Sequence, residues 1–407
     1  MLNGTLVEGD FIKINKGLLP MSWLYGLGVR LRNMLFEMGV LKSRAFSVPV
    51  IAVGNITVGG TGKTPHVEYL LQLLSQDGKV AVLSRGYKRR SRGFVLADES
   101  ATARTIGDEP YQMKLKFPGA MVAVDKDRVH GINQLLRHDP DIDAILLDDA
   151  FQHRYVKPGV NILLVDYHRL IIYDRLLPAG RLREPLKGKD RADIVIITKC
   201  PKELKPVEYR MLTKAMDLYP YQNLYFTTFS YGDLHGVFTG QSLPLSTIAH
   251  EHVLLLTGIA SPRQLIEDLT AKGDLQSPQA VQGDLQSPHL TTLIFPDHHT
   301  FSRKDIRRLN DTFAAMNSPK RIITTEKDAA RLIAAEGLSD EVRHSIYALP
   351  VHVSFMLDQQ STFNENILGY VRKNSRNSIL AKTKDDNKPR DGHRPGNRAR
   401  TISFRNN

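Results

Sequence analysis

Short apolar runs alternate with longer segments of helical spacing through the first half of the chain. The apolar runs occupy residues 50–53, 80–84, 145–148, 162–166 and 194–198. Such alternation is typical of a parallel β-sheet with helices on both faces. A second series of apolar runs, at residues 253–257, 290–295 and 322–325, follows after about Tyr231. The pattern predicts an α/β protein with one parallel-sheet domain and a second, smaller α/β domain.

The segment before the first run has the spacing of an amphipathic helix between Leu18 and Leu41. Its apolar positions are Leu24, Leu27, Leu31, Met34, Leu35 and Met38, and the opposite face carries Ser22, Gly26, Arg30, Asn33 and Glu37. Arg30 and Arg32 interrupt the stretch, which argues against a spanning helix of ~20 mostly apolar residues. Trp23 suits a membrane interface. Periodicity leaves open a helix in the headgroup plane or one packed on the protein core.

A glycine-rich turn links the first apolar run to the helix expected after it. Residues 59–64 read Gly-Gly-Thr-Gly-Lys-Thr, a variant of the phosphate-binding loop (P-loop), whose N–H groups converge on phosphate oxygens. We expect Lys63 to reach the β- and γ-phosphates and Thr64 to ligate Mg²⁺. Thr57 departs from the strict pattern, and Val58 stands where dimeric ATPases with this variant usually have lysine. The predicted nucleotide-binding residues are Thr57, Val58, Gly59, Gly60, Thr61, Gly62, Lys63 and Thr64.

The run at residues 145–148 ends in two adjacent carboxylates, Asp148 and Asp149. A strand that ends in aspartate is the usual source of the second Mg²⁺-linked group beside a phosphate loop, although such an aspartate is otherwise often a helix cap. Successive residues of an extended strand point to opposite sides, so only one of the two is expected to face the metal directly. We predict Asp149, which lies nearer the open end.

Charge and cysteine content change the picture only slightly. The chain carries a net charge of +12, but residues 373–407 hold ten Lys or Arg against three Asp, a net of +7, which leaves +5 for the rest. We expect this tail to be disordered, with either anionic lipid attraction or solubility as its role. No nucleic-acid-binding motif accompanies it, so no nucleic-acid partner is expected. The single cysteine, Cys200, excludes an internal disulfide and favours a reducing, cytoplasmic setting.

An ordered set of short motifs, spread from about Pro20 to about Tyr370, resembles the tetraacyldisaccharide 4'-kinases of lipid A synthesis. The motifs are Val-Gly-Asn-Ile-Thr at 53–57, Leu-Ser-Arg-Gly-Tyr at 83–87, Gly-Asp-Glu-Pro at 107–110, Asp-Asp-Ala-Phe-Gln-His at 148–153, Leu-Pro-Ala-Gly-Arg-Leu-Arg-Glu-Pro at 177–185, Phe-Pro-Asp-His-His at 295–299 and Thr-Glu-Lys-Asp at 325–328. Each motif alone is weak, but their order along the chain is specific to this family.

The resemblance implies a function and a location. It implies ATP and Mg²⁺ as co-substrate and cofactor, a lipid A disaccharide 1-phosphate with a free 4'-hydroxyl as acceptor, and lipid IVA as product. It also implies a peripheral position on the cytoplasmic face of the inner membrane of a Gram-negative bacterium, which favours the interfacial reading of the N-terminal helix. The expected domains are 1–42 (membrane-associating), 43–230 (P-loop), 231–372 (C-terminal α/β) and 373–407 (basic tail).

The resemblance also implies roles for residues that the pattern alone does not single out. Asp108 matches the family's catalytic base, and His298 matches a histidine that tunes that base; the alternatives are helix caps at both positions. Arg183 and Glu184 match residues that line the site, and Arg128 is a further candidate for binding phosphate. Without the resemblance each arginine would be read as solvated surface.

Two other classes of protein share part of these features. A regulatory GTPase needs aspartate at position 201, after Thr198 and Lys199, where the chain has Pro201. A membrane-associated P-loop ATPase acting as a scaffold is disfavoured by Val58 and by the presence of Asp108 and His298.

Overall fold

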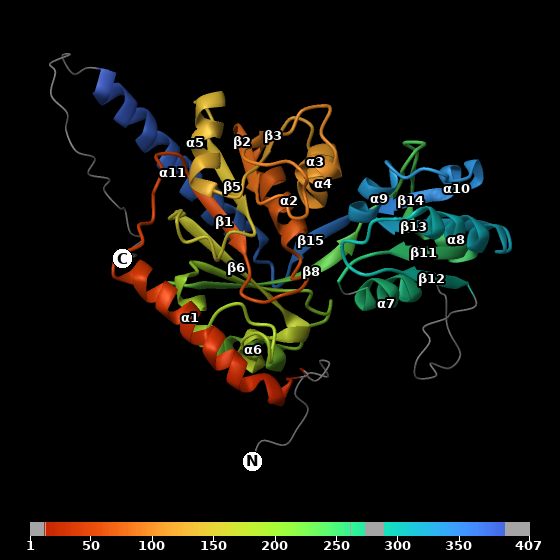
Figure 1. The fold of residues 1–407 in the computed structure, drawn as a ribbon, viewed down its shortest axis with the longest axis horizontal. Helices are drawn as coiled ribbons and strands as arrows, with labels where there is room; N and C mark the ends of the chain where they lie inside the picture. The colour runs from red at the N-terminus through yellow and green to blue at the C-terminus, as the bar shows by residue number, and fades with distance from the viewer. Residues whose placement is uncertain (1–11, 13, 261, 273–288, 387–407) are drawn as a thin grey trace.

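Two β-sheets, each covered by helices, lie side by side in the structure (Figure 1). The structure is a computed structural model and describes residue 12 and residues 14–260, 262–272 and 289–386. The larger sheet has nine strands in the order β15-β8-β7-β6-β1-β5-β2-β4-β3. Its strands are β1 (Val50–Gly54), β2 (Val80–Ser84), β3 (Val95–Leu96), β4 (Met121–Val124), β5 (Ala144–Asp148), β6 (Val160–Asp166), β7 (Ile194–Thr198), β8 (Asn223–Tyr231) and β15 (Val351–Phe355).

All strands between the two edges of this sheet run parallel, as predicted. Ile51 and Val53 pack on one face with α2 (Lys63–Leu74), whereas Val50 packs on the other with α5 (Arg128–His138). Burial on both faces explains why these strands appear as continuous apolar runs. Other helices of this domain are α3 (Ala103–Ile106), α4 (Asp108–Lys116), α6 (Pro206–Met216) and the 3₁₀ helices Lys16–Leu18, Tyr167–Arg169, Ile171–Tyr173 and Leu186–Arg191.

The second domain is built on a six-stranded sheet in the order β10-β9-β14-β13-β11-β12. Its strands are β9 (Leu234–Gly236), β10 (Ser242–Leu243), β11 (His252–Thr257), β12 (Leu290–Ile294), β13 (Lys320–Thr325) and β14 (Ile346–Leu349). Its helices are α7 (Arg263–Lys272), α8 (Arg303–Ala314), α9 (Glu326–Leu332), α10 (Asp340–Ser345) and the 3₁₀ helix Leu245–His250. The second series of apolar runs thus forms a separate sheet, and the predicted fold class is confirmed.

The chain returns to the first domain after the second sheet is complete. β15 pairs antiparallel with β8 at the edge of the larger sheet. The helix α11 (Gln360–Asp386) follows, and its Phe363 is buried in the core of the first domain. The prediction of a second domain over residues 231–372 is therefore wrong at its end, because residues 351–372 bury a strand edge and an apolar helix face against the first domain.

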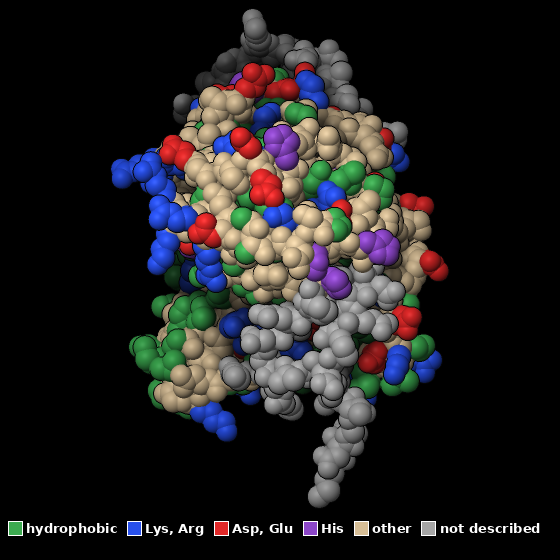
Figure 2. Space-filling view, turned by 90° about the vertical axis from the view of Figure 1, so that its right-hand side faces the viewer, with side chains coloured by type: hydrophobic (Ala, Val, Ile, Leu, Met, Phe, Trp, Pro, Cys, Tyr) green, Lys and Arg blue, Asp and Glu red, His purple; other side chains and the backbone are tan. Residues whose placement is uncertain are grey.

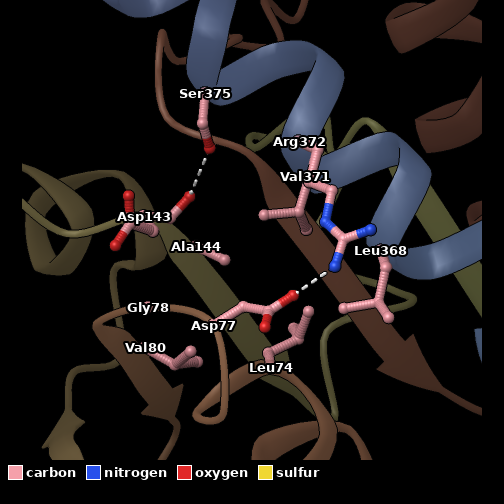
Figure 3. A pocket seen from close by; sticks show the side chains of 10 residues that line it. All are labelled: Leu74, Asp77, Gly78, Val80, Asp143, Ala144, Leu368, Val371, Arg372 and Ser375. Carbon is pink, nitrogen blue, oxygen red and sulfur yellow. Dashed lines mark hydrogen bonds and ion pairs between the residues drawn. The ribbon is translucent and has the colours of Figure 1, made fainter.

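The same helix corrects the predicted start of the tail. Its middle turns lie over the amino ends of β2 and β5, where they close a cavity of about 170 Å³ (Figure 3). Arg372 pairs with Asp77 at 2.6 Å, and Ser375 Oγ donates to the Asp143 carbonyl at 3.4 Å. Disorder from residue 373 is thus wrong as far as Asp386, because further turns propagate from a docked helical nucleus. Residues 387–407 lie outside the described part of the chain.

The N-terminal helix α1 (Leu19–Glu37) lies along the outside of the first domain, on the side away from the second (Figure 1). It docks through its small residues: Ser22 and Gly26 are buried, and a Cβ on Gly26 would come within 2.7 Å of Leu176. Ser22 Oγ donates to the Leu176 carbonyl at 2.9 Å. Phe36 near its end is also buried, but most of the other large apolar side chains point away from the protein, and those exposed include Trp23, Leu24, Leu27, Leu31, Met34 and Met38.

This orientation contradicts the alternative in which the apolar face of α1 packs on the protein core. Viewed from the second-domain end, the upper surface carries scattered acidic and basic side chains, while hydrophobic side chains gather lower down, at the level of α1 (Figure 2). Among the described residues, no helix has both the length and the apolar character needed to cross a bilayer.

Candidate active site

The loop between β1 and α2 has the conformation of a phosphate cradle. Gly59 and Gly62 have φ values of +123° and +76°, which side chains with a Cβ rarely adopt. Asn55 Nδ2 donates to Thr61 Oγ1 at 2.9 Å and so ties the start of the loop to its end. α2 begins at Lys63 without a side-chain cap, which leaves the N–H groups of its first turn for phosphate oxygens.

Only some of the predicted nucleotide-binding residues face outward in this loop. The side chains of Thr57 and Thr61 are buried, so they support the loop's shape, and the N–H of Val58 donates to the Arg181 carbonyl at 2.8 Å. Gly59, Gly60, Gly62, Lys63 and Thr64 form the partly open portion toward α2. The loop therefore offers backbone donors together with the Lys63 amine and the Thr64 hydroxyl.

The end of β7 braces the loop from the side, a contact that the sequence analysis did not predict. Thr198 Oγ1 donates to the Thr61 carbonyl at 3.0 Å. Lys199, at a φ of +58°, donates to the Gly60 carbonyl and to Asp166 Oδ2, the latter at 2.7 Å. These bonds fix the loop before any nucleotide binds. The Thr-Lys pair had been considered only as part of a guanine signature.

Asp148 and Asp149 lie at the carboxyl end of β5, which is directly hydrogen-bonded to β1. Asp148 is buried and accepts a bond from Ser84 Oγ at 3.0 Å. Burial and the neighbouring Asp149 charge raise the pKa of Asp148 to about 6. Asp149 has a φ of +48°, an unusual value for a residue other than glycine and one that recurs at functional sites.

Asp149 lies between two cations. Its carboxylate is 3.5 Å from Lys63 Nζ and 3.5 Å from an Arg183 guanidinium nitrogen. Burial opposes ionisation of Asp149, but the charges of Lys63 and Arg183 outweigh it and lower its pKa. Asp148 Oδ1 and Asp149 Oδ1 are both buried and accept no hydrogen bond within the described residues. Two orphan carboxylate oxygens beside a phosphate loop fit the hard-oxygen preference of Mg²⁺.

A second group of charged residues lies where the two domains meet. Asp108 is the first residue of α4, and its Oδ2 is 2.9 Å from Nδ1 of His298, in the second domain. His298 has a φ of +57°, again an unusual backbone conformation for its residue type. The ring of Tyr87 meets the His298 ring edge-on at 4.9 Å between centroids. The structure therefore brings together the two residues that the family resemblance paired.

Arg331 of α9 joins this pair, and the sequence analysis missed it. Its guanidinium donates to Asp108 Oδ2 at 2.6 Å and to the fully buried Asp328 at 2.7 Å. Burial opposes ionisation of Asp108, but the bonds from His298 and Arg331 hold its pKa well below the usual range. Both bonds use Oδ2, so Oδ1 is left without a hydrogen bond from the described residues. Arg331 lies three residues after the Thr-Glu-Lys-Asp motif, so that motif's helix was the available signal.

Asp108, Glu109 and His298 also present ligand-type atoms within 4.8 Å of one another. Cations of the protein already occupy this cluster: Arg331 bonds Asp108, and Lys327 Nζ lies 2.9 Å from Glu109. A metal ion there would have to displace one of these pairs. The cluster is therefore better described as a charge-paired carboxylate site than as a metal centre.

The three predicted substrate-binding residues differ in position. Arg183 is partly exposed beside Asp149, as a phosphate ligand should be. Arg128 is 2 % exposed and donates to the carbonyls of Asp125 and Asp148, so in this structure it holds the turn after β5. Glu184 is buried and paired with Arg191 at 2.8 Å. Direct binding of phosphate or substrate by Arg183, Arg128 and Glu184 stays a prediction.

The phosphate loop and the strand-end carboxylates together define a P-loop phosphotransferase, and the Asp108–His298 pair lies where its two domains meet. Comparison with known proteins specifies the family. The family described as tetraacyldisaccharide-1-P 4'-kinase matches residues 14–372, and the chain belongs to it.

Curated relatives and a solved structure agree with this assignment. A tetraacyldisaccharide 4'-kinase of Phocaeicola vulgatus is 56% identical over 377 residues, which are 91% of this chain and 99% of the relative. One of Bacteroides thetaiotaomicron is 52% identical over 386 residues, 92% of this chain and 98% of the relative. The crystal structure of LpxK from Aquifex aeolicus in complex with ATP is 28% identical, with a TM-score of 0.66, and covers 88% of this chain and 99% of its own. The chain is therefore a phosphotransferase that acts on a hydroxyl group, and the GTPase and scaffold alternatives are not favoured.

Proposed function

We propose that this protein transfers the γ-phosphoryl group of ATP to the 4'-hydroxyl of a tetraacyldisaccharide 1-phosphate at a membrane surface, forming lipid IVA. The observation that carries the proposal is the Asp108–His298 contact across the two domains, close to the carboxylates beside the phosphate loop. The charge of Glu109, which is next to Asp108 in the sequence, contributes to the raised pKa of Asp148. The Asp108–His298 pair and the carboxylates beside the phosphate loop therefore lie within electrostatic range of each other. A hydroxyl bound between them would face both a carboxylate and the transferring phosphoryl.

Asp108 orients the acceptor hydroxyl. Its Oδ2 is held by His298 and Arg331. Its Oδ1 is free to accept a hydrogen bond from the hydroxyl group of the acceptor. Because its pKa lies well below the usual range, Asp108 is ionised at neutral pH and is a weak base. A loose phosphoryl-transfer transition state needs little deprotonation of the nucleophile before attack, so alignment counts for more than basicity. The proton moves to Asp108 late in the transfer.

The phosphoryl group is stabilised from the other side. Lys63 places a positive charge at the β- and γ-phosphates, and Arg183 adds a second near Asp149. Thr64 and one of Asp148 and Asp149 would hold Mg²⁺, which when bound neutralises charge on the phosphate oxygens. The backbone donors of the loop position the triphosphate.

The outward-facing apolar side of α1 supports action at a membrane surface. A soluble protein rarely exposes a continuous row of leucines, methionines and a tryptophan, since their contact with water is unfavourable. Tyr25 of α1 donates to the carbonyl of Arg183 at 2.7 Å, so the helix is tied directly to the catalytic segment. We assign the protein to the cytoplasmic face of the inner membrane, where ATP and a bilayer-anchored acceptor meet.

A transfer assay tests this function. Purified protein, labelled ATP, Mg²⁺ and a tetraacyldisaccharide 1-phosphate in detergent micelles should give a product phosphorylated at the 4'-position. Asp108→Ala should lower kcat by ~10²-fold or more with little change in nucleotide affinity, and adding His298→Ala should cost little further if the two act as a unit.

The control for that experiment is His299→Ala. His299 adjoins His298 but pairs with Asp305 at 2.9 Å, within the second domain. Its removal should leave kcat within a few-fold of the unaltered enzyme. Losses from Asp108→Ala and His298→Ala that multiply, or phosphorylation at another hydroxyl, would contradict the proposal.

A further inference from the structure

One lysine of the first domain bridges two carboxylates that come from distant parts of the chain. The ammonium of Lys116, the last residue of α4, donates to Glu68 Oε2 of α2 at 2.8 Å and to Glu326 Oε2 of α9 at 3.0 Å. Figure 1 shows α4 between these two helices. α2 begins at the phosphate loop, and α9 belongs to the second domain. We call Glu68, Lys116 and Glu326 the interdomain triad.

The interdomain triad is largely shielded from water, which distinguishes it from a solvated surface pair. The side chains of Glu68, Lys116 and Glu326 are 5 %, 24 % and 19 % exposed. The second oxygen of Glu68, Oε1, accepts a hydrogen bond from Gln112 Nε2 at 2.7 Å. Burial raises the pKa of Glu68 to about 7, and the charge of Lys116 opposes that rise. Without Lys116, Glu68 would be left with an uncompensated buried charge or would take up a proton.

The helix α4 connects the interdomain triad to the acceptor end of the site. Asp108, Gln112 and Lys116 follow one another at four-residue spacing, so they lie along one side of α4. At its first residue this side meets the second domain through the bond between Asp108 and Arg331. At its middle and its end it holds Glu68 through Gln112 and Lys116. The position of Asp108 therefore depends on contacts at both ends of a short helix.

The helix α9 contacts α4 at both ends as well. Glu326 is the first residue of α9 and pairs with Lys116 at 2.9 Å, whereas Arg331, five residues later, pairs with Asp108 at 2.6 Å. The start of α9 thus lies at the end of α4, and the two helices are held together along their length. The bonds to Glu68 then fix this helix pair against α2, the helix that follows the phosphate loop.

We infer that Lys116 is a positioning residue, which sets where Asp108 stands relative to the phosphate loop by holding Glu68 and Glu326 together. This inference rests on the proposed function, in which Asp108 orients the acceptor hydroxyl. Lys116 lies eight residues from Asp108, about 12 Å along a helix, so it acts through α4 and not on the reacting atoms. A misplacement of about 1 Å caused by a distant substitution can lower a rate ~10²-fold, so a loosened α4 should be visible in kcat.

The first measurement uses Lys116→Met with ATP, Mg²⁺ and the tetraacyldisaccharide 1-phosphate in neutral detergent micelles. Methionine keeps most of the length of the side chain and removes its charge. We expect kcat to fall ~10-fold through poorer alignment. KM for ATP should stay within a few-fold, because Thr198 and Lys199 brace the phosphate loop independently of α4. Lys116→Arg retains a cation with several donors and should keep kcat within a few-fold of the unaltered enzyme.

The second measurement repeats the substitution in protein that already carries Asp108→Ala. If Lys116 acts by placing Asp108, Lys116→Met should cost less than ~2-fold in kcat in this background, because there is no carboxylate left to misplace. A merely structural role would give the same ~10-fold loss in both backgrounds. The Tm of each variant, measured under assay conditions, shows that folded proteins are compared.

Lys114→Met is the matched control, because it removes the same charge from the same helix. The ammonium of Lys114 donates to the Pro118 carbonyl at 2.9 Å, within the first domain. This variant should leave kcat and both KM values unchanged. If Lys116→Met does not fold, Glu326→Gln takes its place, since it cuts the tie to the second domain and leaves the pair of Glu68 and Lys116 intact. It should lower kcat several-fold, and again only where Asp108 is present.

Three outcomes would overturn the inference. One is full activity of Lys116→Met, and another is an equal loss from this substitution with and without Asp108. The third is a rise in KM for ATP that accounts for the whole loss, which would assign Lys116 to nucleotide binding. Full activity of Asp108→Ala would instead refute the orienting role on which the proposed function depends, and the inference would fall with it.

Discussion

Replacing Arg331 with glutamine should weaken the alignment of Asp108 and move the acid limb of the pH–rate profile to higher pH. The side chain of Arg331 is 7 % exposed, and its guanidinium donates to Asp108 Oδ2 at 2.6 Å. Together with His298 it keeps the pKa of Asp108 well below the usual range. Glutamine retains a hydrogen-bond donor but removes the positive charge.

The size of the effect follows from the contact. A hydrogen bond to a charged group contributes about 1.5–3 kcal/mol, and one pKa unit corresponds to about 1.4 kcal/mol. Loss of Arg331 should therefore raise the pKa of Asp108 by about 1–2 units. Because Asp108 must be ionised to accept the hydroxyl proton, activity should be lost at a correspondingly higher pH as the solution is acidified. At neutral pH Asp108 stays ionised, so kcat should fall only by ~10-fold through poorer alignment.

Protonation of Asp108 also lowers the stability of the folded protein. Asp108 has a lowered pKa in the folded protein, so its pairing stabilises the fold above the unfolded pKa, and that contribution is lost as the pH falls through the folded value. Arg331→Gln also leaves the fully buried Asp328 without its cation, which should lower the Tm. Tm must therefore be measured at each pH used.

The assay is the pH dependence of kcat/KM for unaltered enzyme, Arg331→Gln and the charge-retaining control Arg331→Lys. Arg331→Lys should keep the acid limb near its original position, although a single ammonium group cannot reproduce the forked contacts to Asp108 and Asp328. An acid limb that does not move in Arg331→Gln, in protein shown to be folded, would refute the role assigned to Arg331.

Further outcomes are expected at the phosphate site and at α1. Lys63→Ala should reduce kcat by ~10²-fold or more, measured at saturating ATP, because the transferring phosphoryl loses its nearest cation. The rate at saturating Mg²⁺ should fall as the pH falls through about 6, where Asp148 takes up a proton, whereas the Mg²⁺ requirement should stay unchanged. In Mg²⁺ titrations Asp149→Ala should raise the metal requirement sharply and Asp148→Ala should not; unchanged metal dependence with full activity in both would remove this segment from the site. Leu27→Asp/Leu31→Asp should reduce the affinity for vesicles, measured by co-sedimentation, by ~10²-fold, while any ATP hydrolysis is retained.

The strands could be predicted because each is encoded within a few consecutive residues. Burial on both faces makes a parallel strand apolar at every position, and the runs at 80–84 and 194–198 coincide with β2 and β7. The final strand, β15, and the helix α11 were assigned to the wrong domain. Nothing local distinguishes a strand that pairs within the preceding sheet from one that crosses back to an earlier sheet.

The helix α1 shows the same limit. Its amphipathic spacing was readable, but spacing does not say which face meets the protein. The docking face is the one with Ser22 and Gly26, because small residues let the helix approach residues 176–179 closely. The larger apolar side chains are thereby left on the outer surface of the protein.

By itself the sequence determined the phosphate loop, the strand-end aspartates and the α/β class, since each depends on contiguous residues whose backbone geometry is local. Only the tertiary structure decided that Arg331 and His298 bond to the same oxygen of Asp108. Arg331 lies more than two hundred residues from Asp108 along the chain. The tertiary structure also decided that four cations from three separate segments, Lys42, Arg44, Arg85 and Lys126, line one cavity at the carboxyl edge of the larger sheet. The first arrangement arises where the second domain meets the first, and the second arises where the carboxyl ends of parallel strands meet. Charges gathered from distant segments acquire their effect only through that proximity.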